Sequence, residues 1–380
     1  MLTERVPLSG LTTLRVGGPA ARLAEARSAD DVVEAVLAAD ATGDPLLVLG
    51  SGSNLVVSDG GFPGTALRVA TAGVTVTEAG SRVLVTVAAG ENWDQVVDWS
   101  VTEKLAGLEC LAGIPGLAGA TPIQNVGAYG QEVAATITTV TVLDRATCSV
   151  TSLANADCGF GYRTSRFKRT AWPPAKPVGQ GSAARGPTGR FVVLDVTFEL
   201  ERDPLSVPVR YAELAAKLGV ETGDRAPLDD VRAAVLELRR GKGMVLDSAD
   251  PDTMSVGSFF TNPVLGPGEL ATLQRVLETR RPGTRVPTFP AQADAGGAGH
   301  SAEPRFKVSA AWLIEQAGFG KGYPGRGAAR ISSKHTLALT NAGGATAADL
   351  IGLARQIAAG VRSAFGIELD HEPVLVGLTL

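Results

Sequence analysis

The sequence predicts an α+β protein with about two or three domains. Its 380 residues exceed what one hydrophobic core ordinarily holds. Between residues 73 and 88, valines alternate with polar residues on either side of Ala79-Gly80, a pattern that predicts an antiparallel hairpin. After Pro204, helix-like and strand-like periodicities follow one another. We therefore expect an antiparallel sheet in the first half of the chain and a mixed α/β region in the second.

Composition excludes several classes of protein. Apolar residues make up 44% and charged residues 19% of the chain, as in soluble globular proteins and unlike disordered ones. The net charge is −4, and no cluster of lysine and arginine is interleaved with aromatic residues, so we expect neither a nucleic-acid nor an anionic-membrane partner. No apolar run approaches the roughly 18 residues that cross a bilayer.

We expect a cytoplasmic protein without a metal site. Glu4 and Arg5 stand where a signal peptide would have its apolar core. Cys110, Cys148 and Cys158 are odd in number and lack CxxC spacing, which suits free thiols in a reducing compartment. The three histidines all lie at or after residue 300 and are far apart in sequence, so a structural zinc site is not expected.

Periodicity predicts the elements of the first half of the chain. Residues 11–20 read as a short strand that ends in a turn. A helix is predicted from Ser28, which forms a capping box with Asp31. Leu46–Leu49 is a predicted strand, and it leads into the small-residue turn Gly50–Asn54.

Further strands and a helix follow this turn. A helix from Glu91 puts Trp93 on its apolar face, where tryptophan belongs more often to a core than to a site. Strands are predicted over residues 136–144, 148–153 and 191–200.

The second half predicts mainly helices, strands and loops of mixed length. Helices are expected over residues 211–219, 227–241, 267–280 and, between the caps Thr346 and Gly366, 347–365. Residues 307–341 read as a helix, a glycine-rich turn and a strand, and 367–377 as a final strand. The segments 171–190, 255–265 and 290–305 are predicted to be loops.

Two glycine-rich stretches are candidates for ligand binding. Residues 107–132 carry recurring glycines and two prolines, so main chain can approach a ligand closely while the prolines hold the loop in one shape. A flat or phosphorylated ligand lying on these amides and a plain surface loop both fit this composition. The turn Gly50–Asn54 follows a strand and can cradle a phosphate, but Leu55 replaces the third glycine of a Rossmann fingerprint and no helix pattern follows.

The combination of motifs resembles one family of flavoenzymes. Seven segments occur in the order found in UDP-N-acetylenolpyruvoylglucosamine reductases, which act in peptidoglycan synthesis: VLGSGSNLVVSDGGFPG, GLECLAGIPGLAGATPIQNVGAYGQEV, CGFGYRTSRFK, VGSFFTNPV, AAWLIEQAG, SSKHTLALTN and IELDHEPVLVG. The resemblance runs from about Leu11 to Gly377, and the loops 171–190 and 290–305 fit it least.

This resemblance implies an FAD-binding domain of the p-cresol methylhydroxylase/vanillyl-alcohol-oxidase type in two lobes, followed by an α/β substrate-binding domain. The first lobe would be 1–72 completed by 361–380, the second 73–206, and the substrate domain 207–360. We expect non-covalent FAD, because no histidine precedes residue 300 to tether a flavin. The implied FAD-binding residues lie in the first motifs: Arg15, Gly50, Ser51, Gly52, Ser53, Asn54, Ile114, Pro115, Gly116, Gly119, Ala120, Thr121, Asn125 and Gly127.

The resemblance also implies the reaction and its residues. NADPH would reduce the flavin, and the enolpyruvyl ether of UDP-N-acetylglucosamine would then be reduced to UDP-N-acetylmuramate. By motif position, Arg163 would pair with the substrate carboxylate through two parallel bonds, and Ser258 would give a proton. We expect Glu372 to be protonated and to donate a hydrogen bond as enolate charge develops. The next residue, Pro373, departs from the valine of the family.

Further positions resemble contacts to substrate or nicotinamide: Tyr129, Tyr211, Lys242, Asn262 and Gln316. Tyr211 lies in VRYAEL, which resembles the subtype whose tyrosine loop covers the UDP-sugar. The implied protein is a cytoplasmic monomer that serves cell wall biogenesis, cell shape and cell division.

Two alternatives remain open at this stage. One is an FAD oxidase of an alcohol or hydroxy acid on the same fold, which would need a base near flavin N5 and access for oxygen. The other is a flavin- or nucleotide-binding sensor, in which Arg163, Ser258 and Glu372 would have no chemical role.

Overall fold

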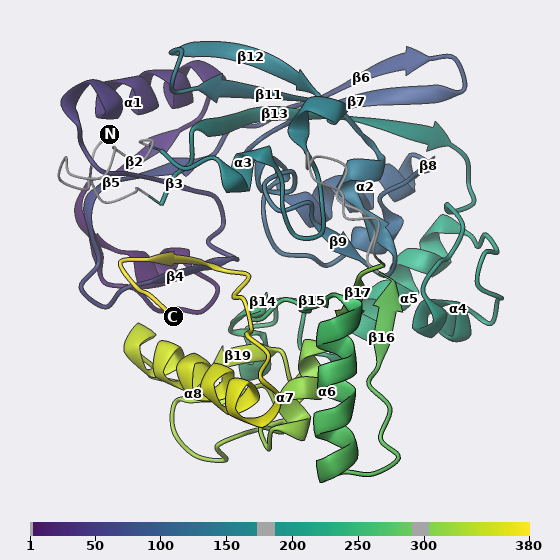
Figure 1. Ribbon diagram of the computed structural model, residues 1–380. Helices are drawn as coiled ribbons and strands as arrows, with labels where there is room; N and C mark the ends of the chain where they lie inside the picture. Colours follow the sequence, from purple (N-terminus) through teal and green to yellow (C-terminus); the bar gives the residue numbers. More distant parts are fainter. Residues whose placement is uncertain (1–2, 173–186, 291–303) are drawn as a thin grey trace. The chain divides into compact units, whose positions relative to one another are not determined.

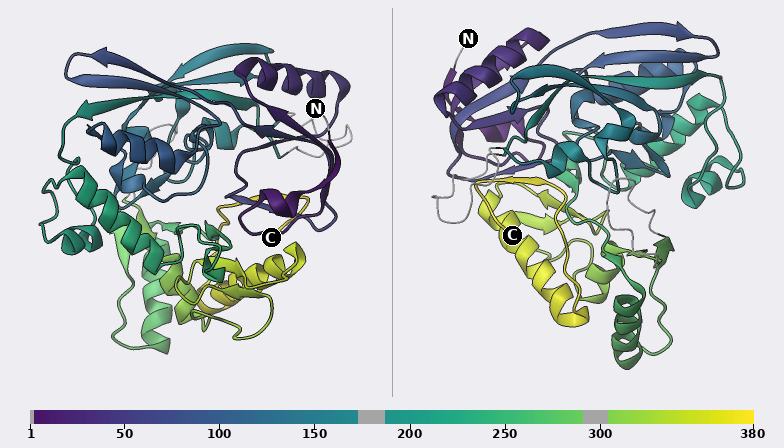
Figure 2. Two further views of the ribbon diagram at one scale, coloured as in Figure 1. Left: turned by 180° about the vertical axis from the view of Figure 1, so that it is seen from behind. Right: turned by 45° about the horizontal axis from the view of Figure 1, so that its top comes forward.

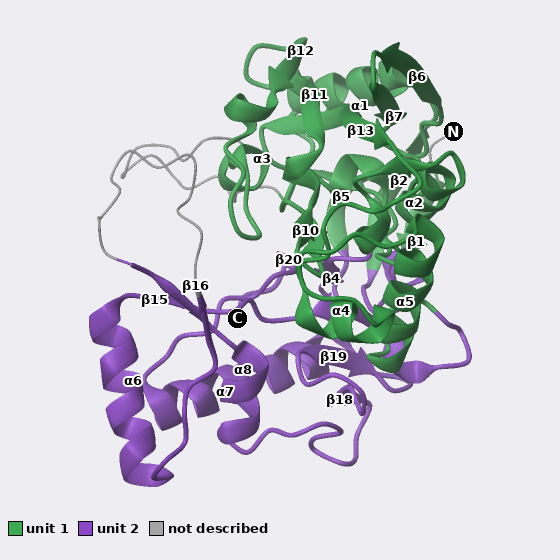
Figure 3. Cartoon of the chain, turned by 90° about the vertical axis from the view of Figure 1, so that its right-hand side faces the viewer, with its two compact units in different colours: residues 1–7, 19–52, 62–246 green, residues 8–18, 53–61, 247–380 purple. Residues whose placement is uncertain are grey.

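The computed structural model describes residues 3–172, 187–290 and 304–380 (Figure 1). These residues form two compact units, each assembled from several parts of the chain (Figure 3). Unit 1 comprises Met1–Pro7, Pro19–Gly52 and Phe62–Leu246, and unit 2 comprises Leu8–Gly18, Ser53–Gly61 and Asp247–Leu380. Most of the two loops predicted at 171–190 and 290–305 lies outside the described residues. The predicted domains 1–72, 73–206 and 207–360 stay a prediction.

The first sheet of unit 1 has the strand order β1-β2-β5-β3. Its strands are β1 (Thr3–Pro7), β2 (Pro19–Ala26), β3 (Leu46–Leu49) and β5 (Phe62–Val69). β1 pairs with β2 antiparallel, whereas β5 runs parallel to both β2 and β3. Helix α1 (Ala29–Thr42) contacts β2 and β5, and Ser28 and Asp31 form the predicted capping box at its start.

The second sheet of unit 1 is antiparallel, with the order β12-β11-β13-β7-β6. Its strands are β6 (Val74–Ala79), β7 (Arg82–Ala88), β11 (Ile137–Asp144), β12 (Ser149–Ala154) and β13 (Phe191–Arg202), and the short β8 (Leu105–Ala106) pairs with β13. The predicted hairpin across Ala79-Gly80 is confirmed, since Ala79 pairs with Arg82. The two views of Figure 2 show this sheet from behind and with its top tilted toward the viewer.

Helix α2 (Trp93–Thr102) contributes a tryptophan to this core. Trp93 is fully buried, as predicted, and its ring lies 5.6 Å from that of Phe198 on β13, centroid to centroid. The remaining helices and short strands of the unit are α3 (Arg166–Arg169), α4 (Ala212–Leu218), α5 (Leu228–Gly241), β9 (Gly127–Ala128) and β10 (Gln131–Glu132).

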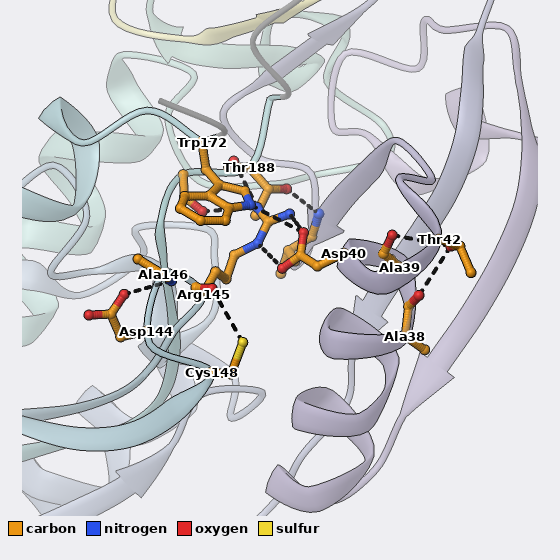
Figure 4. A network of polar contacts seen from close by, with 12 residues as sticks. Ala38, Ala39, Asp40, Thr42, Asp144, Arg145, Ala146, Cys148, Trp172 and Thr188 are labelled. Carbon is orange, nitrogen blue, oxygen red and sulfur yellow. Dashed lines mark hydrogen bonds and ion pairs between the residues drawn. The ribbon is translucent and has the colours of Figure 1, made fainter. Parts of the chain in front are cut away.

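A polar network joins the two sheets of unit 1 (Figure 4). Arg145, in the turn after β11, donates two hydrogen bonds to the carboxylate of Asp40 on α1, at 2.9 and 2.5 Å. The same guanidinium donates to the carbonyls of Thr188 and Gly189, both at 3.1 Å. Trp172 lies against it and donates its indole N–H to Asp40 at 3.2 Å. Thr188 Oγ1 in turn accepts from the amide of Val48 on β3, so α1 and β3 are both tied to the second sheet.

Unit 2 contains three small sheets, with the orders β14-β19-β18, β15-β17-β16 and β20-β4, among the described residues. Their strands are β4 (Leu55–Val57), β14 (Ser255–Ser258), β15 (Val264–Leu265), β16 (Thr288–Pro290), β17 (Phe306–Val308), β18 (Ala329–Ile331), β19 (Ala338–Asn341) and β20 (Val374–Val376). Its helices are α6 (Pro267–Arg280), α7 (Ala310–Gln316) and α8 (Ala347–Phe365).

Helix α8 has the predicted ends. Thr346 is its N-cap, and Gly366 follows it with a φ of 70°, a left-handed conformation that glycine adopts at little cost. Asp59 adds a second anchor, because its carboxylate accepts from the amides of Ala347 and Ala348 at 2.8 and 3.0 Å. Within the described ranges, no helix is long and apolar enough to cross a membrane.

The predicted strand at residues 11–20 is wrong. The 3-10 turn Leu8–Leu11 precedes an irregular segment, and β2 begins only at Pro19. Arg15 has a φ of 53°, which no β-strand allows. Long-range bonds decide this conformation, since Thr13 donates to the carbonyl of Ser255 at 2.7 Å.

The loop predicted at 255–265 is also wrong in part. Ser255–Ser258 forms β14, and both Phe259 and Phe260 are buried in the unit 2 core. A register shift between Ser255 and Ser258 removes the regular alternation that marks a strand in sequence.

Candidate active site

The glycine-rich segment of unit 1 is held in one shape, as its two prolines predict. The amides of Ala118 and Gly119 donate to the carbonyls of Glu91 and Ala89, both at 2.9 Å. Asp94, in the first turn of α2, accepts from the amide of Gly113 at 2.6 Å. The start of α2 closes this frame, because the amide of Trp93 donates to the carbonyl of Gly116 at 3.2 Å.

Residues 113–127 are suited to form an uncharged cradle that binds a dinucleotide. They contain no ionisable side chain, so the segment itself brings no carboxylate against a diphosphate. The turn that follows β3 lies against this segment, since a Cβ on Gly50 would come within 3.2 Å of Leu117 Cδ1. Residues 114–117 are partly exposed. The predicted FAD residue Gly50 therefore lies beside the segment that contains the predicted FAD residues Ile114–Gly116, in unit 1.

Four other predicted FAD residues have structural roles in the same loop. The amides of Gly119, Ala120 and Thr121 already donate to backbone carbonyls. Asn125 is buried with a φ of 49°, and its side-chain amide group donates to Glu132 and Gly161 and accepts from Ala134. These residues shape the cradle, because their donors are directed at oxygens of the protein itself.

Arg163 is anchored beside the same loop. Its Nη2 donates to the carbonyl of Gly127 at 2.8 Å and its Nη1 to that of Asn125 at 3.5 Å. Gly127 leaves the room for this contact, because a Cβ there would meet Glu132 Cγ at 2.7 Å and Arg163 Nη1 at 3.4 Å. The guanidinium is therefore a positive group whose position is set by main-chain oxygens.

Three predicted substrate contacts are brought together in unit 1. The rings of Tyr129 and Tyr211 meet edge to face with centroids 5.4 Å apart, and Lys242 Nζ lies 5.5 Å from the Tyr129 ring centroid. Glu213 accepts from Lys242 at 2.6 Å. Burial raises the pKa of Tyr129 to about 12, so its phenol stays protonated near neutral pH and can donate a hydrogen bond.

Ser258 and Glu372 lie on neighbouring segments of unit 2 although 114 positions separate them in the sequence. Ser258 ends β14, and the carbonyl of the next residue, Phe259, accepts from the amide of Glu372 at 2.8 Å. An isolated bridge between Phe260 and His371 continues this pairing. Of the three predicted catalytic residues, the structure thus brings two together in unit 2, and Arg163 belongs to unit 1.

Asn54 lies directly beside Glu372. Its backbone carbonyl accepts from the amide of Val374 at 2.9 Å, and its side chain donates to the carbonyl of Glu372 at 3.4 Å. Ser53 precedes it in unit 2, whereas Gly50, Ser51 and Gly52 belong to unit 1. The unexpected Pro373 contributes an acceptor, because His371 Nδ1 donates to its carbonyl at 2.8 Å.

The remaining predicted residues of unit 2 are on its surface or at helix ends. Arg15 is exposed, between the buried Leu14 and Val16. Asn262 Oδ1 accepts from the amide of Ala310 at the start of α7, at 2.9 Å. Gln316 Oε1, at the end of α7, accepts from Arg281 at 2.5 Å.

Sequence reasoning missed two residues near these groups. Arg239 on α5 is 8% exposed and donates to the carbonyls of Gly113 and Met244, at 3.2 and 2.8 Å. Burial lowers its pKa to about 10, which leaves it charged at neutral pH. His335 Nε2 lies 3.5 Å from Ser258 Oγ. Only the basic run RRGK hinted at Arg239, and SSKH carried no pattern that singled out its histidine.

No group of acidic, histidine or cysteine side chains within the described part of the chain could hold a metal ion. Cys110 and Cys158 are buried, and burial raises the pKa of the Cys158 thiol to about 12. Burial raises the pKa of the Cys110 thiol as well. Neither thiol is therefore ionised near neutral pH.

Comparison with known proteins identifies the class and then the family. Residues 20–153 match the family model of an FAD binding domain, and residues 250–376 match that of the UDP-N-acetylenolpyruvoylglucosamine reductase C-terminal domain. With the glycine-lined cradle, this defines an FAD-binding flavoprotein of the predicted α+β class.

Full-length relatives specify it further. The chain is 54% identical to a UDP-N-acetylenolpyruvoylglucosamine reductase of Thermobifida fusca, over 99% of this chain and 98% of the relative. A relative of that name from Streptomyces coelicolor is also 54% identical, over 98% and 90%. The crystal structure of this reductase from Thermus caldophilus is similar with a TM-score of 0.61 at 25% identity, covering 99% of this chain and 100% of that one. The chain belongs to the UDP-N-acetylenolpyruvoylglucosamine reductase family, which confirms the resemblance.

Proposed function

We propose that the protein reduces UDP-N-acetylglucosamine enolpyruvate to UDP-N-acetylmuramate with NADPH, through non-covalent FAD. The names of its full-length relatives support this reaction. The observation that carries it is the pairing of Phe259 with Glu372, which puts the chain of a proton donor, Ser258, next to that of a carboxyl group. A serine and a carboxyl group drawn together from distant segments are what protonation of an enolate requires.

Each residue has one task in this reaction. FAD, held by the glycine-lined cradle of unit 1, would supply the transfer of hydride from NADPH to the terminal carbon of the enolpyruvyl group. Arg163 holds the substrate carboxylate, where negative charge accumulates as the carbon–carbon double bond is reduced. Glu372, whose amide donates to the carbonyl of Phe259, brings a carboxyl group to the same part of the substrate. Ser258 gives its proton to the carbon that bears the carboxylate.

We assign binding of the UDP-sugar to the aromatic and basic cluster of unit 1, which comprises Tyr129, Tyr211 and Lys242. Lys242 offers a cation to the diphosphate, and Tyr129 a phenol that stays protonated. Tyr211 is 43% exposed and is suited to fold over a bound sugar, as the tyrosine-loop subtype requires. Asn262 and Gln316 complete the set of polar contacts. The product would enter peptidoglycan synthesis in the cytoplasm, and the enzyme would act as a monomer.

Substitution of Ser258 tests the proposal. In Ser258→Ala, NADPH should bleach the flavin as fast as in the wild type, because no proton from Ser258 is needed. Reoxidation by the enolpyruvyl substrate should slow by on the order of 10²-fold or more, the usual effect of losing a positioned acid. Anaerobic stopped-flow absorbance measures the two half-reactions separately.

Ser255→Ala is the matched control. It lies on the same strand and accepts a hydrogen bond from the amide of Gly257, so it reports any general disturbance of β14. Its reoxidation rate should stay near that of the wild type. Equal slowing of both half-reactions in Ser258→Ala would reduce Ser258 to a packing or binding residue, and a wild type that its substrate does not reoxidise would refute the function.

A further inference from the structure

We infer that His335 returns to Ser258 the proton that Ser258 gives to the substrate; this rests on the proposed function. A serine hydroxyl is a weak acid, so protonation of carbon leaves an alkoxide that must be neutralised before the next turnover. Nothing in the reaction with NADPH supplies that second proton at Ser258. A side chain able to supply it lies close by, since His335 Nε2 is 3.5 Å from the Ser258 hydroxyl oxygen.

The pairing of β14 with β19 brings the side chains of Ser258 and His335 close together. Ser258 lies opposite Ala338 in the ladder of β14 and β19, and Phe259 donates its amide to the carbonyl of Leu337 at 2.7 Å. His335 stands in the turn that enters β19, three residues before Ala338. Both residues are half-buried, so exchange with solvent remains open to the imidazole. Hydrogen bonds of this length in ligand-free enzymes commonly tighten when substrate binds.

The turn that carries His335 is built to hold one position. Ser332, fully buried, accepts through Oγ from the amides of Lys334 and His335, at 3.0 and 3.2 Å. The amide of Ala338 donates to the carbonyl of His335 at 3.1 Å, which closes the turn. Such fixed geometry is what a proton-transfer partner needs, because a small displacement breaks the transfer path.

The charged groups around this turn are paired. Lys334 Nζ donates to Asp250 at 2.6 Å, and this bond holds the pKa of Lys334 above its usual range. Burial favours the neutral form of Asp252, but two bonds from Ser333 outweigh it and hold the pKa of Asp252 below its usual range. On the other side, Thr336 donates to Glu315 of α7. Asp252 and Lys334 therefore keep their charge near neutral pH. Of the groups named around this turn, the imidazole is the one whose ordinary pKa, about 6.5, lies near neutral pH.

The proton count closes without another reactant. Protonated His335 donates its Nε2 proton to Ser258 Oγ while Oγ releases its own proton to the substrate carbon. Ser258 therefore carries no negative charge after the transfer. Neutral His335 then takes from the solvent the one proton that the overall reaction consumes. No electrons move in this relay, since hydride from NADPH accounts for the whole reduction. His335 acts only through Ser258 and touches neither substrate nor flavin in this scheme.

His335→Gln tests the relay, because glutamine keeps an N–H near the same place but exchanges no proton at neutral pH. The NADPH-reduced holoenzyme is mixed with UDP-N-acetylglucosamine enolpyruvate from about pH 5.5 to 8.5, around the imidazole pKa. Wild-type reoxidation should fall as pH rises through one inflection. The variant should lose this inflection and be on the order of 10- to 100-fold slower at the acid end, with flavin reduction by NADPH, FAD content and thermal unfolding unchanged.

Lys334→Gln is the control from the same turn. It removes a charge and the bond to Asp250 but should keep the inflection and most of the rate. A His335→Gln enzyme with the wild-type rate and pH profile overturns the inference and leaves the proposed function standing. Equal slowing in Lys334→Gln would likewise overturn it, since the turn would then matter only as structure. A wild type that is reduced by NADPH but not reoxidised by the enolpyruvyl substrate overturns the inference and the function together.

Discussion

Gly119 shows how a single residue of the cradle, residues 113–127, packs against the rest of unit 1. Its amide is bonded to the carbonyl of Ala89, and a Cβ would clash with the Ala89 Cβ and come within 2.9 Å of its Cα. Gly119→Ala should therefore destabilise the protein by about 1–3 kcal/mol, the usual cost of overpacking. Urea unfolding, with FAD retention measured alongside, tests it.

Gly352 provides the opposite case for the same substitution. It lies inside α8, and a Cβ there would meet no heavy atom within 4 Å beyond the adjoining backbone of the helix. Gly352→Ala should stabilise by roughly 0.5–1 kcal/mol through helix propensity. Equal unfolding midpoints for Gly119→Ala and the wild type would show that the loop can move away, and the cradle would then be less rigid than its hydrogen bonds indicate.

The candidate site residues were predictable from the sequence only where a motif carried them. Ser258 and Glu372 stand in motifs, and the structure draws their chains together. His335 and Arg239 depend on contacts across 77 positions in one case and 126 in the other. No local pattern encodes such contacts, because they arise from strand pairing and helix packing. The side chain of Asn125 binds its own loop, and its predicted contact with FAD stays a prediction.

At the scale of elements, the Arg145–Asp40 pair is the main link between α1 and the second sheet of unit 1 (Figure 4). The Arg145 side chain is 6% exposed and that of Asp40 20%. Arg145→Met should cost about 2–3 kcal/mol, somewhat less than the loss of a fully buried partner, because Asp40 keeps some contact with water. Loss of FAD at lower urea than in the wild type is expected as well, since the network also holds β3, which leads into Gly50.

An exposed pair gives the comparison for this prediction. Arg202 and Glu78, with side chains 50% and 62% exposed, are joined at 2.6 Å in the same unit. Arg202→Ala should cost less than about 1 kcal/mol. If Arg145→Met lowers the free energy of unfolding no more than Arg202→Ala does in chemical denaturation, the network adds no measurable stability to the junction of the two sheets.

Elements with complete local signals were the predictable ones. Ser28 with Asp31, and Thr346 with Gly366, mark the ends of α1 and α8 in sequence and in structure. Residues 8–18 and 255–265 carry no such signals, since their conformations depend on bonds such as Thr13 to Ser255. Hydrophobic periodicity detects an element only when the element meets its partners regularly, which a register shift at Ser258 prevents.

At the scale of the whole molecule, both units are assembled from separate parts of the chain. Residues 8–18 and 53–61 leave the first sheet of unit 1 and join unit 2 with residues 247–380. There, β4 pairs in parallel with the C-terminal strand β20, and Asp59 anchors α8.

Both units should lose stability in acid. Hydrogen bonds from Arg190 hold the pKa of Asp144 in unit 1 below its usual value of 3.8, and the backbone amide of Thr346 does the same for Asp349 in unit 2. The unfolded chain therefore binds these protons first as pH falls. The stabilisation is complete above about pH 5 and is lost as pH drops through the lower native pKa values. The urea midpoint should be similar at about pH 6 and 5 and should decrease below about pH 4.

Asp144→Asn separates this effect from a general rise in positive charge. The variant should be less stable at about pH 6, because Arg190 loses a charged partner, but it should lose less stability between about pH 5 and 3 than the wild type does. Asp30→Asn, at an exposed position in the first turn of α1 and outside the capping box of Ser28 and Asp31, should keep the wild-type acid dependence. An acid loss in Asp144→Asn equal to that of the wild type would mean that the net charge of the molecule, and not its paired carboxylates, governs unfolding in acid.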